Sequence, residues 1–181
     1  MEVLDWKGFS SVSPARLYLI ASTEAAIDDY MYSVRYRSVI DAAGAKILRG
    51  ERCVNELRVF QEFAAALQFP SYFGENWDAL EESLLDLDWL PAPAYVLFLT
   101  SVDAVLRDHD RGFRTLVSIL SRVSRDWMEP TPPEVEPTRP RTPFHVVFQT
   151  TKEALTVSRS RLETVGARPV DARLEGSDRS A

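Results

Sequence analysis

Cysteine, histidine and glycine are scarce in this chain of 181 residues, which contains one, two and seven of them. The single cysteine, Cys53, has no second cysteine with which to form an internal disulfide. No apolar run approaches the roughly 18 residues of a membrane span, and none follows a basic start as the core of a signal peptide does. These absences lead us to expect a protein of the reducing cytoplasm.

The same scarcity argues against the common catalytic and cofactor-binding motifs. His109 and His145 do not lie at metal-ligand spacing, so the zinc patterns are missing. The glycines form neither a phosphate loop nor a dinucleotide fingerprint, and no Gly-x-Ser-x-Gly turn occurs. We expect no cofactor, no metal and no enzymatic activity, with Cys53 as a small buried residue and both histidines as structural or surface residues.

Positive charge is missing from a long central stretch. Between Arg58 and Arg107 there is no lysine or arginine. The stretch contains eight acids: Glu62, Glu75, Asp78, Glu81, Glu82, Asp86, Asp88 and Asp103. The whole chain carries a formal net charge of −6, and its sequence pI is about 5.0. This balance opposes nonspecific attraction to nucleic acid phosphates and favours a basic protein partner.

The hydrophobic pattern predicts an α/β protein, and a hydrophobic content of 45% is sufficient for a core. Short apolar runs predict buried strands at 17–20, 45–48, 95–99 and 144–148. Helical spacing and capping residues predict helices that begin near Thr23, Asn55, Asn76, Phe113 and Lys152. Because strands and helices alternate, we expect a parallel sheet that is covered by helices.

Two of these helices have further predicted features. The first should end at Asp41, shortly before Gly44. The second should end at Pro70 and turn one apolar side towards the core, formed by Leu57, Phe60, Phe63, Ala64 and Leu67.

Proline marks the main boundary in the chain. Six of the sixteen residues from Met128 to Pro143 are proline, which predicts an extended surface connector because proline disrupts both helices and central strands. We therefore expect one globular domain in four segments. They are an N-terminal βα extension packed on the same sheet at 1–43, a core at 44–127, the connector at 128–143, and a strand, helix and tail at 144–181.

The helix after Asn76 is predicted to have one apolar and one acidic face. Its core face is formed by residues at spacings of three and four, namely Trp77, Leu80, Leu84 and Leu87. A separate carboxylate stripe is formed by Glu75, Asp78, Glu82 and Asp86. Like charges four residues apart cost a helix roughly 0.2 to 0.5 kcal/mol per pair, and acids near its C-terminus oppose its dipole. The stripe does not serve helix stability, so we expect compensation from outside the helix.

Two other interpretations of the stripe remain open. It could be a solvated face that keeps the protein soluble. It could also bind a hard cation, because carboxylate oxygens suit Mg²⁺ or Ca²⁺, through Asp78, Glu82, Asp86 and Asp88. Calcium loops place such oxygens on a turning segment that contains glycine, and a helical stripe fits that geometry poorly.

The segment from Phe69 to Glu82, FPSYFGENWDALEE, resembles the barstar family of inhibitors of the ribonuclease barnase. The Tyr-aromatic-Gly-Glu-Asn-x-Asp-Ala-Leu pattern carries the resemblance, which extends more loosely from Ala45 to Trp127. It implies a three-layer fold with a small parallel sheet flanked by helices. The N-terminal βα unit and a C-terminal βα unit would extend that fold.

The resemblance also implies a site. In the family, an acidic helix and the loop before it fill the nuclease active site, with carboxylates where RNA phosphates would lie. The partner-binding residues implied or expected here are Tyr72, Gly74, Glu75, Asp78, Glu81, Glu82, Leu85, Asp86 and Asp126.

This chain departs from the family's best known inhibitor at several of these positions. Glu82 stands in place of an aspartate, and Glu81 and Leu85 replace a tryptophan and a threonine. Arg122 and Asp126 stand in place of two glutamates on a later helix. The sequence thus predicts a cytoplasmic, bacterial immunity-type inhibitor of a basic ribonuclease. The alternative is a regulatory module of the same fold that binds a basic protein other than a nuclease.

Overall fold

The structure, a computed structural model, describes residues 1–5, 9, 17–37, 44–129 and 140–175. The predicted end of the first helix at Asp41, most of the proline-rich connector and the end of the tail lie outside these residues. None of the helices in the described residues combines the length and the hydropathy that a membrane span requires.

The six strands of the described residues form one parallel sheet. They are β1 (Glu2–Leu4), β2 (Leu17–Ala21), β3 (Ala45–Arg49), β4 (Tyr95–Thr100), β5 (Phe144–Thr150) and β6 (Val170–Leu174). Their order across the sheet is β1-β6-β2-β5-β4-β3, and all neighbours are parallel. The predicted parallel sheet is confirmed.

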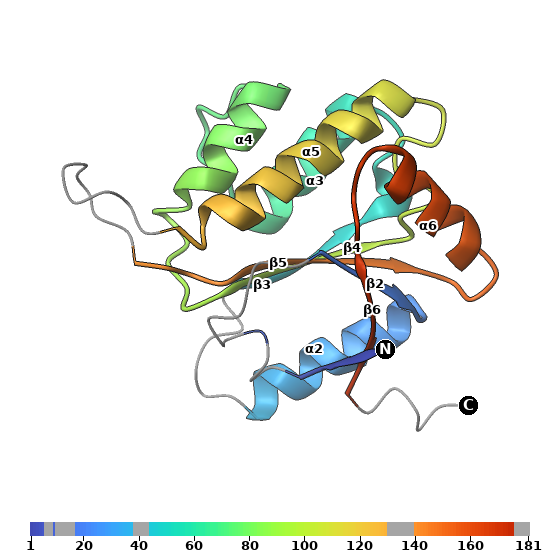
Figure 1. The fold of residues 1–181 in the computed structure, drawn as a ribbon. Coiled ribbons are helices and arrows are strands. Elements are labelled where there is room, and N and C mark those ends of the chain that lie inside the picture. The colour runs from blue at the N-terminus through green and yellow to red at the C-terminus, as the bar shows by residue number, and fades with distance from the viewer. Residues whose placement is uncertain (6–8, 10–16, 38–43, 130–139, 176–181) are drawn as a thin grey trace.

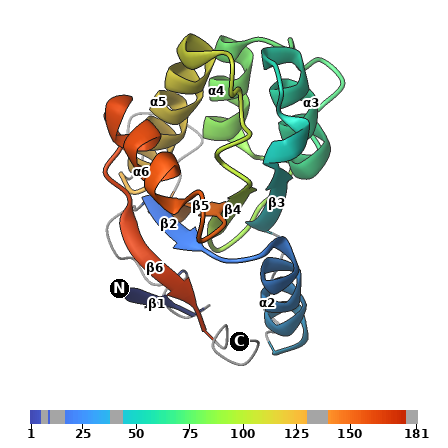
Figure 2. The same cartoon turned by 90° about the vertical axis from the view of Figure 1, so that its right-hand side faces the viewer.

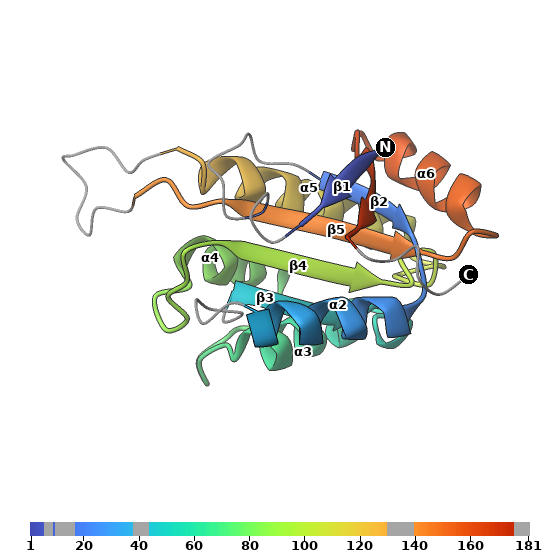
Figure 3. The ribbon, with the colours of Figure 1, turned by 90° about the horizontal axis from the view of Figure 1, so that it is seen from below.

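Helices cover both faces of the sheet. They are α2 (Glu24–Arg37), α3 (Glu56–Leu67), α4 (Trp77–Asp86), α5 (Asp110–Asp126) and α6 (Leu155–Thr164). Helix α2 lies on one face and the other four lie on the opposite face (Figure 1). Figure 2 shows the same three layers after a quarter turn, and Figure 3 shows α2 running in roughly the direction of β3 and β4. The three-layer α/β fold expected from the sequence is confirmed.

The strands β4 and β5 are buried along their whole length, and this is why their sequences are mostly apolar. Successive side chains of a strand point to opposite faces, so each strand contributes to two cores. Leu97 and Leu99 join the core beneath α3, α4 and α5, whereas Val96 and Phe98 join the core above α2. The large core beneath α4 provides the support for the acidic helix.

The N-terminal βα unit belongs to the same sheet. β2 lies between β6 and β5, with Leu19 opposite Phe148 of β5. At the carboxyl ends of these strands, the Gln149 side chain donates to the Ser22 carbonyl at 2.6 Å and accepts from the Ser101 backbone N–H at 2.9 Å. Gln149 therefore joins the chain segments that follow β2 and β4.

Several details differ from the sequence predictions. Leu57 is 50% exposed, so its expected place in the core is wrong, while Phe60, Phe63 and Leu67 are buried as predicted. α3 ends at Leu67 rather than at Pro70, because Gln68 adopts a left-handed conformation with φ 54°. The short edge strand β1 and the strand β6 were not predicted. β1 is only three residues long, and Asp171 and Arg173 interrupt the apolar pattern of β6.

The histidines and Cys53 lie where the sequence suggested. His145 is buried in β5 beside the rings of Phe9 and Tyr18, and His109 is exposed before α5. Cys53 is fully buried, and its Sγ lies 3.6 Å from the Arg49 carbonyl oxygen. Burial, with a smaller contribution from the Glu62 carboxylate, raises the pKa of the Cys53 thiol from 9.0 to about 12.

We expect two glycine substitutions to differ sharply in cost. A Cβ at Gly50 would lie 2.0 Å from the Thr100 carbonyl oxygen, so Gly50→Ala should destabilise the fold by more than about 3 kcal/mol through overpacking. A Cβ at Gly166 meets nothing within 4 Å, but φ is +93°. Gly166→Ala should therefore cost only about 1–2 kcal/mol. Urea unfolding of both variants measures the difference, and equal costs would contradict the packing at Gly50.

The buried thiol gives a pH-dependent prediction. Because the folded-state pKa of Cys53 is raised, the unfolded chain ionises first as the pH rises. The contribution of this group to stability is therefore complete below about pH 9 and is lost between about pH 9 and 12. In the part of this pH range where the protein still folds, the free energy of unfolding should fall more steeply with rising pH for the wild type than for Cys53→Ala. Parallel pH profiles would show that the thiol is not buried.

Candidate functional site

The acidic helix α4 begins at a well-formed cap. The side-chain oxygen of Asn76 accepts a hydrogen bond from the Ala79 backbone N–H at 2.9 Å, which satisfies one of the free donors at the helix start. The same side chain donates to the Gly74 carbonyl at 3.1 Å. Glu75, between them, adopts a left-handed conformation with φ 45°. Asn76 thus fixes the direction in which the loop enters the helix.

The loop before α4 rests on aromatic rings and exposes one of its own. Phe73 packs edge-on against Phe69, with ring centroids 4.8 Å apart, and Phe69 packs against Trp89 at 5.8 Å. Both phenylalanines border the core, as expected for residues that support the loop. Tyr72 is 79% exposed and extends beyond this layer. The loop therefore offers a single large aromatic side chain to solvent.

The underside of α4 is anchored in the core. Leu80 and Leu84 are fully buried, and Trp77 packs edge-on against Phe60 at 4.9 Å. The indole Nε1 of Trp127, at the end of α5, donates to the Leu84 carbonyl at 2.8 Å. This carbonyl lies in the last turn of α4, where main-chain acceptors lack partners within the helix. The apolar seam predicted from Trp77, Leu80, Leu84 and Leu87 is thus largely confirmed.

The carboxylate stripe is on the outer side. Glu75, Asp78, Glu82 and Asp86 are all exposed. None of their side chains forms an ion pair or a hydrogen bond with another described residue. Asp78, Glu82 and Asp86 succeed one another at intervals of about 6 Å along the helix axis. The helix therefore holds a row of solvated carboxylates at fixed spacing, and the intramolecular compensation is absent from the part of the chain that the structure describes.

Glu81 differs from the stripe. Its side chain is 18% exposed, and its Oε1 lies 2.9 Å from Nε of Arg122 on α5. The direction of this contact does not meet the requirement for a hydrogen bond, so the two groups form an ion pair without an aligned donor. Arg122 itself is 51% exposed. Glu81 was expected among the partner-binding residues. In the free protein, however, its negative charge is balanced by Arg122.

The remaining predicted site residues surround the stripe. Gly74 is exposed in the loop, and an added Cβ would lie 3.1 Å from the Asn76 side chain. Leu85 is half-buried and packs against the core. Asp126 is half-buried at the end of α5, which packs against α4. The fold thus brings the loop, α4 and the end of α5 together on one side of the sheet.

Two features of the site were not foreseen. The pairing of Glu81 with Arg122 depends on how α4 and α5 pack, which the sequence does not reveal. The bond from Trp127 to Leu84 depends on the same packing. The cap at Asn76 was available to sequence reasoning, because asparagine directly before an amphipathic segment is a common N-cap.

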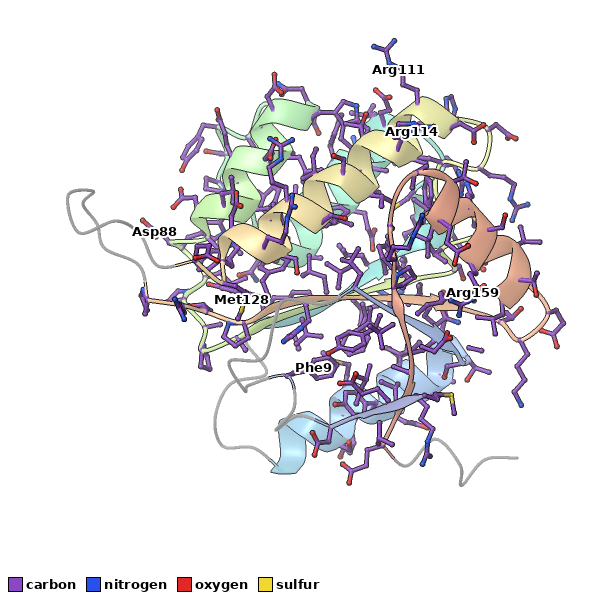
Figure 4. The ribbon with its side chains drawn as sticks, viewed as in Figure 1. Phe9, Asp88, Arg111, Arg114, Met128 and Arg159 are labelled. Atoms are coloured by element: carbon purple, nitrogen blue, oxygen red, sulfur yellow. The ribbon has the colours of Figure 1, made fainter. Side chains whose placement is uncertain are left out.

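A metal site receives no geometric support. Among the residues that the structure describes, no group of three or more histidine, cysteine, aspartate or glutamate side chains is arranged to hold a metal ion. Asp88, one of the proposed cation ligands, follows the end of α4 and points outward, as labelled in Figure 4.

We expect Asn76→Ala to loosen the loop and the start of α4 more than it lowers the stability of the whole fold. Loss of the cap should destabilise the protein by about 0.5–2 kcal/mol. Asn55 caps α3 through the same bond, to the Arg58 N–H at 3.0 Å, and provides the matched control. Both variants should lose similar stability in urea, but only Asn76→Ala should accelerate backbone hydrogen exchange in residues 72–80. Equal exchange in the two variants would contradict a positioning role for Asn76.

Comparisons with known proteins give one family match. The family model described as "Barstar (barnase inhibitor)" matches residues 45–149. The match reaches further than the 44–127 segment expected from the resemblance and includes β5. No curated protein matches the chain.

Solved structures include distant likenesses. Drosophila ORC bound to AT-rich DNA and Cdc6 contains a chain with 12% identity and a TM-score of 0.46, covering 92% of this chain and 51% of that one. Drosophila ORC bound to GC-rich DNA and Cdc6 contains a chain with 10% identity and a TM-score of 0.45. That match covers 94% of this chain and 54% of the other. This chain therefore spans about half the length of those two chains, and scores at this level carry no functional meaning. The family match covers more than half of the chain, and the protein belongs to the barstar family.

Proposed function

We propose that this protein is a cytoplasmic inhibitor of a basic, barnase-like ribonuclease, and that it is not an enzyme. The carboxylate row on α4 and the loop that carries Tyr72 would block the active site of the nuclease. The observation that carries the proposal is the exposure of Glu75, Asp78, Glu82 and Asp86 without an internal counter-charge among the described residues. Membership of the barstar family supports a barnase-like ribonuclease as the partner class.

The charges of the two proteins would be complementary. A nuclease that holds RNA needs cationic side chains in its cleft, because phosphate is bound by charge-assisted hydrogen bonds. Carboxylates on α4 would accept those hydrogen bonds in place of the phosphate oxygens. The anchoring of α4 by Leu80, Leu84 and Trp127 means that little ordering remains to be done when the complex forms.

Tyr72 would contribute contact area beside the charges. The residue is 79% exposed, although most tyrosines bury much of their apolar surface. Tyrosine is enriched among the residues that dominate binding energy, because it offers a large rigid surface and a polar end. The turn that presents it is closed by the Phe73 N–H, which donates to the Pro70 carbonyl at 3.0 Å.

One observation favours a second candidate. The ion pair of Glu81 with Arg122 reduces the negative charge on the α5 side of the site and leaves a half-exposed guanidinium there. A partner that is uniformly basic would be repelled by Arg122. A regulatory module that binds a non-nuclease basic protein with an acidic neighbouring patch would fit this surface as well. The two candidates share the acidic helix and differ in the partner.

The test measures inhibition of RNA cleavage by a panel of barnase-like ribonucleases that includes barnase. The wild type should inhibit at least one of them at equimolar concentration. Asp78→Ala combined with Glu82→Ala should fold normally but weaken inhibition by at least about 30-fold, because the loss of one close charge pair costs about 2–5 kcal/mol; the barnase–barstar pair of this same family is a source of that range.

The matched control removes two acids elsewhere. Glu153→Ala combined with Glu175→Ala makes the same change in net charge on exposed residues away from α4 and should leave inhibition unchanged. If the α4 variant inhibits as well as the wild type, the site is wrong. If no ribonuclease of the panel is inhibited, and a basic protein without nuclease activity binds α4 instead, the second candidate replaces the first.

A further inference from the structure

The outer face of α5 carries a row of arginines. Arg111, Arg114, Arg122 and Arg125 follow one another at helical spacings, with the exposed Ser118 between them, so they lie within a narrow sector of the helix. All four are exposed. Arg111 extends away from the protein at the start of α5 (Figure 4). This arginine row is prominent in a protein whose net charge is −6.

Within the part of the chain that the structure describes, most of the arginine row has no counter-charge. The guanidinium groups of Arg111, Arg114 and Arg125 form no ion pair or hydrogen bond with other residues in the described ranges. Arg122 uses one nitrogen for Glu81. A guanidinium has five donor hydrogens, so each of these side chains retains capacity for an acidic ligand. The proposed inhibition assigns no binding role to Arg111, Arg114 or Arg125.

The arginine row lies beside the acidic helix. α4 and α5 pack against each other, and Figure 1 shows them adjacent on the same side of the sheet. The contact between Glu81 and Arg122 shows that side chains of the two helices reach one another. One side of the protein therefore presents two neighbouring stripes of opposite sign, with four exposed acids at or near α4 and four exposed arginines on α5.

Two neighbouring stripes of opposite sign discriminate between polyanions and proteins. Packed helices lie about 8–10 Å apart, which is close to the Debye length at physiological salt. An RNA strand laid on α5 would therefore also feel the carboxylates of α4 and be repelled by them. A ligand with its own alternating stripes avoids this repulsion. A second copy of this chain is such a ligand.

We propose that the arginine row of α5 binds the acidic helix α4 of a second copy, so that the protein forms a weak, charge-driven dimer. A two-fold axis between α4 and α5 would place α4 of each copy opposite α5 of the other, and one surface would serve both partners. Each exposed ion pair contributes only about 0.2–1 kcal/mol, so the dimer forms at high concentration and low salt. A further consequence, which rests on the proposed function, is that a dimer hides the inhibitory surface.

Sedimentation velocity on the full chain without any ribonuclease tests this association. At protein concentrations approaching about 1 mM and salt near about 0.1 M, the wild type should contain a dimer. Raising the salt to about 1 M shortens the Debye length from about 10 Å to about 3 Å and should weaken association at least about tenfold. A wild type that stays monomeric throughout, or a dimer that is insensitive to salt, would overturn the proposal.

Charge reversal identifies the two helices. Arg111→Glu, Arg114→Glu and Arg125→Glu together give a variant whose α4 and α5 are both acidic. Asp78→Lys, Glu82→Lys and Asp86→Lys give one in which both are basic. Each variant alone should be monomeric, and an equimolar mixture should restore a heterodimer. Failure of the mixture to associate would contradict the pairing of α4 with α5.

A control separates local pairing from total charge. Arg58→Glu, Arg141→Glu and Lys152→Glu change the net charge as much as the α5 variant does, at exposed residues on other elements. This variant should still dimerise, and loss of its dimer would overturn the assignment to α5. Labelled single-stranded RNA at about 0.1 M salt should not bind the wild type; RNA binding that the α5 reversal abolishes would identify a polyanion site instead.

Discussion

The burial of one side of α4 is the constraint on which the site depends. A ten-residue helix that carries like charges four residues apart is unstable alone, because short helices in water are marginal even with favourable sequences. Leu80 and Leu84 place its apolar side in the core, and Trp127 satisfies the carbonyl of Leu84. Tertiary packing therefore keeps α4 helical although the like charges on its outer side lower helix stability. Those exposed charges remain available to bind a partner.

The surface that results is polarised. The carboxylates at 75, 78, 82 and 86 lie without partners among the described residues, whereas Glu81 is neutralised by Arg122 at 2.9 Å. The negative face is therefore narrower than the number of acids in the sequence suggests, and the arginines of α5 border it on one side. The proposed function would require a partner with a cationic cleft of limited width.

Much of the fold was predictable because local signals agreed with one another. The apolar runs of β4 and β5, the cap at Asn76 and the seam of α4 all follow from periodicity and capping chemistry. The errors arose where tertiary contacts decide. Leu57 fits the helical pattern of α3 yet lies in solvent, and β6 forms because strands on both sides satisfy its backbone. The pairing of Arg122 with Glu81 required the packing of α4 against α5, which no spacing along the chain encodes.

The proposed inhibition has the carboxylates of α4 replace RNA phosphates in a ribonuclease cleft. Steady-state cleavage kinetics at fixed inhibitor concentrations test it most directly, with an oligonucleotide substrate and the inhibited barnase-like ribonuclease. The apparent KM for RNA should rise with inhibitor concentration while kcat stays constant, because inhibitor and RNA compete for one cleft. With inhibitor in large excess over the ribonuclease and binding at equilibrium, a fall in kcat at constant KM would mean that RNA and inhibitor bind together, and it would contradict phosphate mimicry by α4.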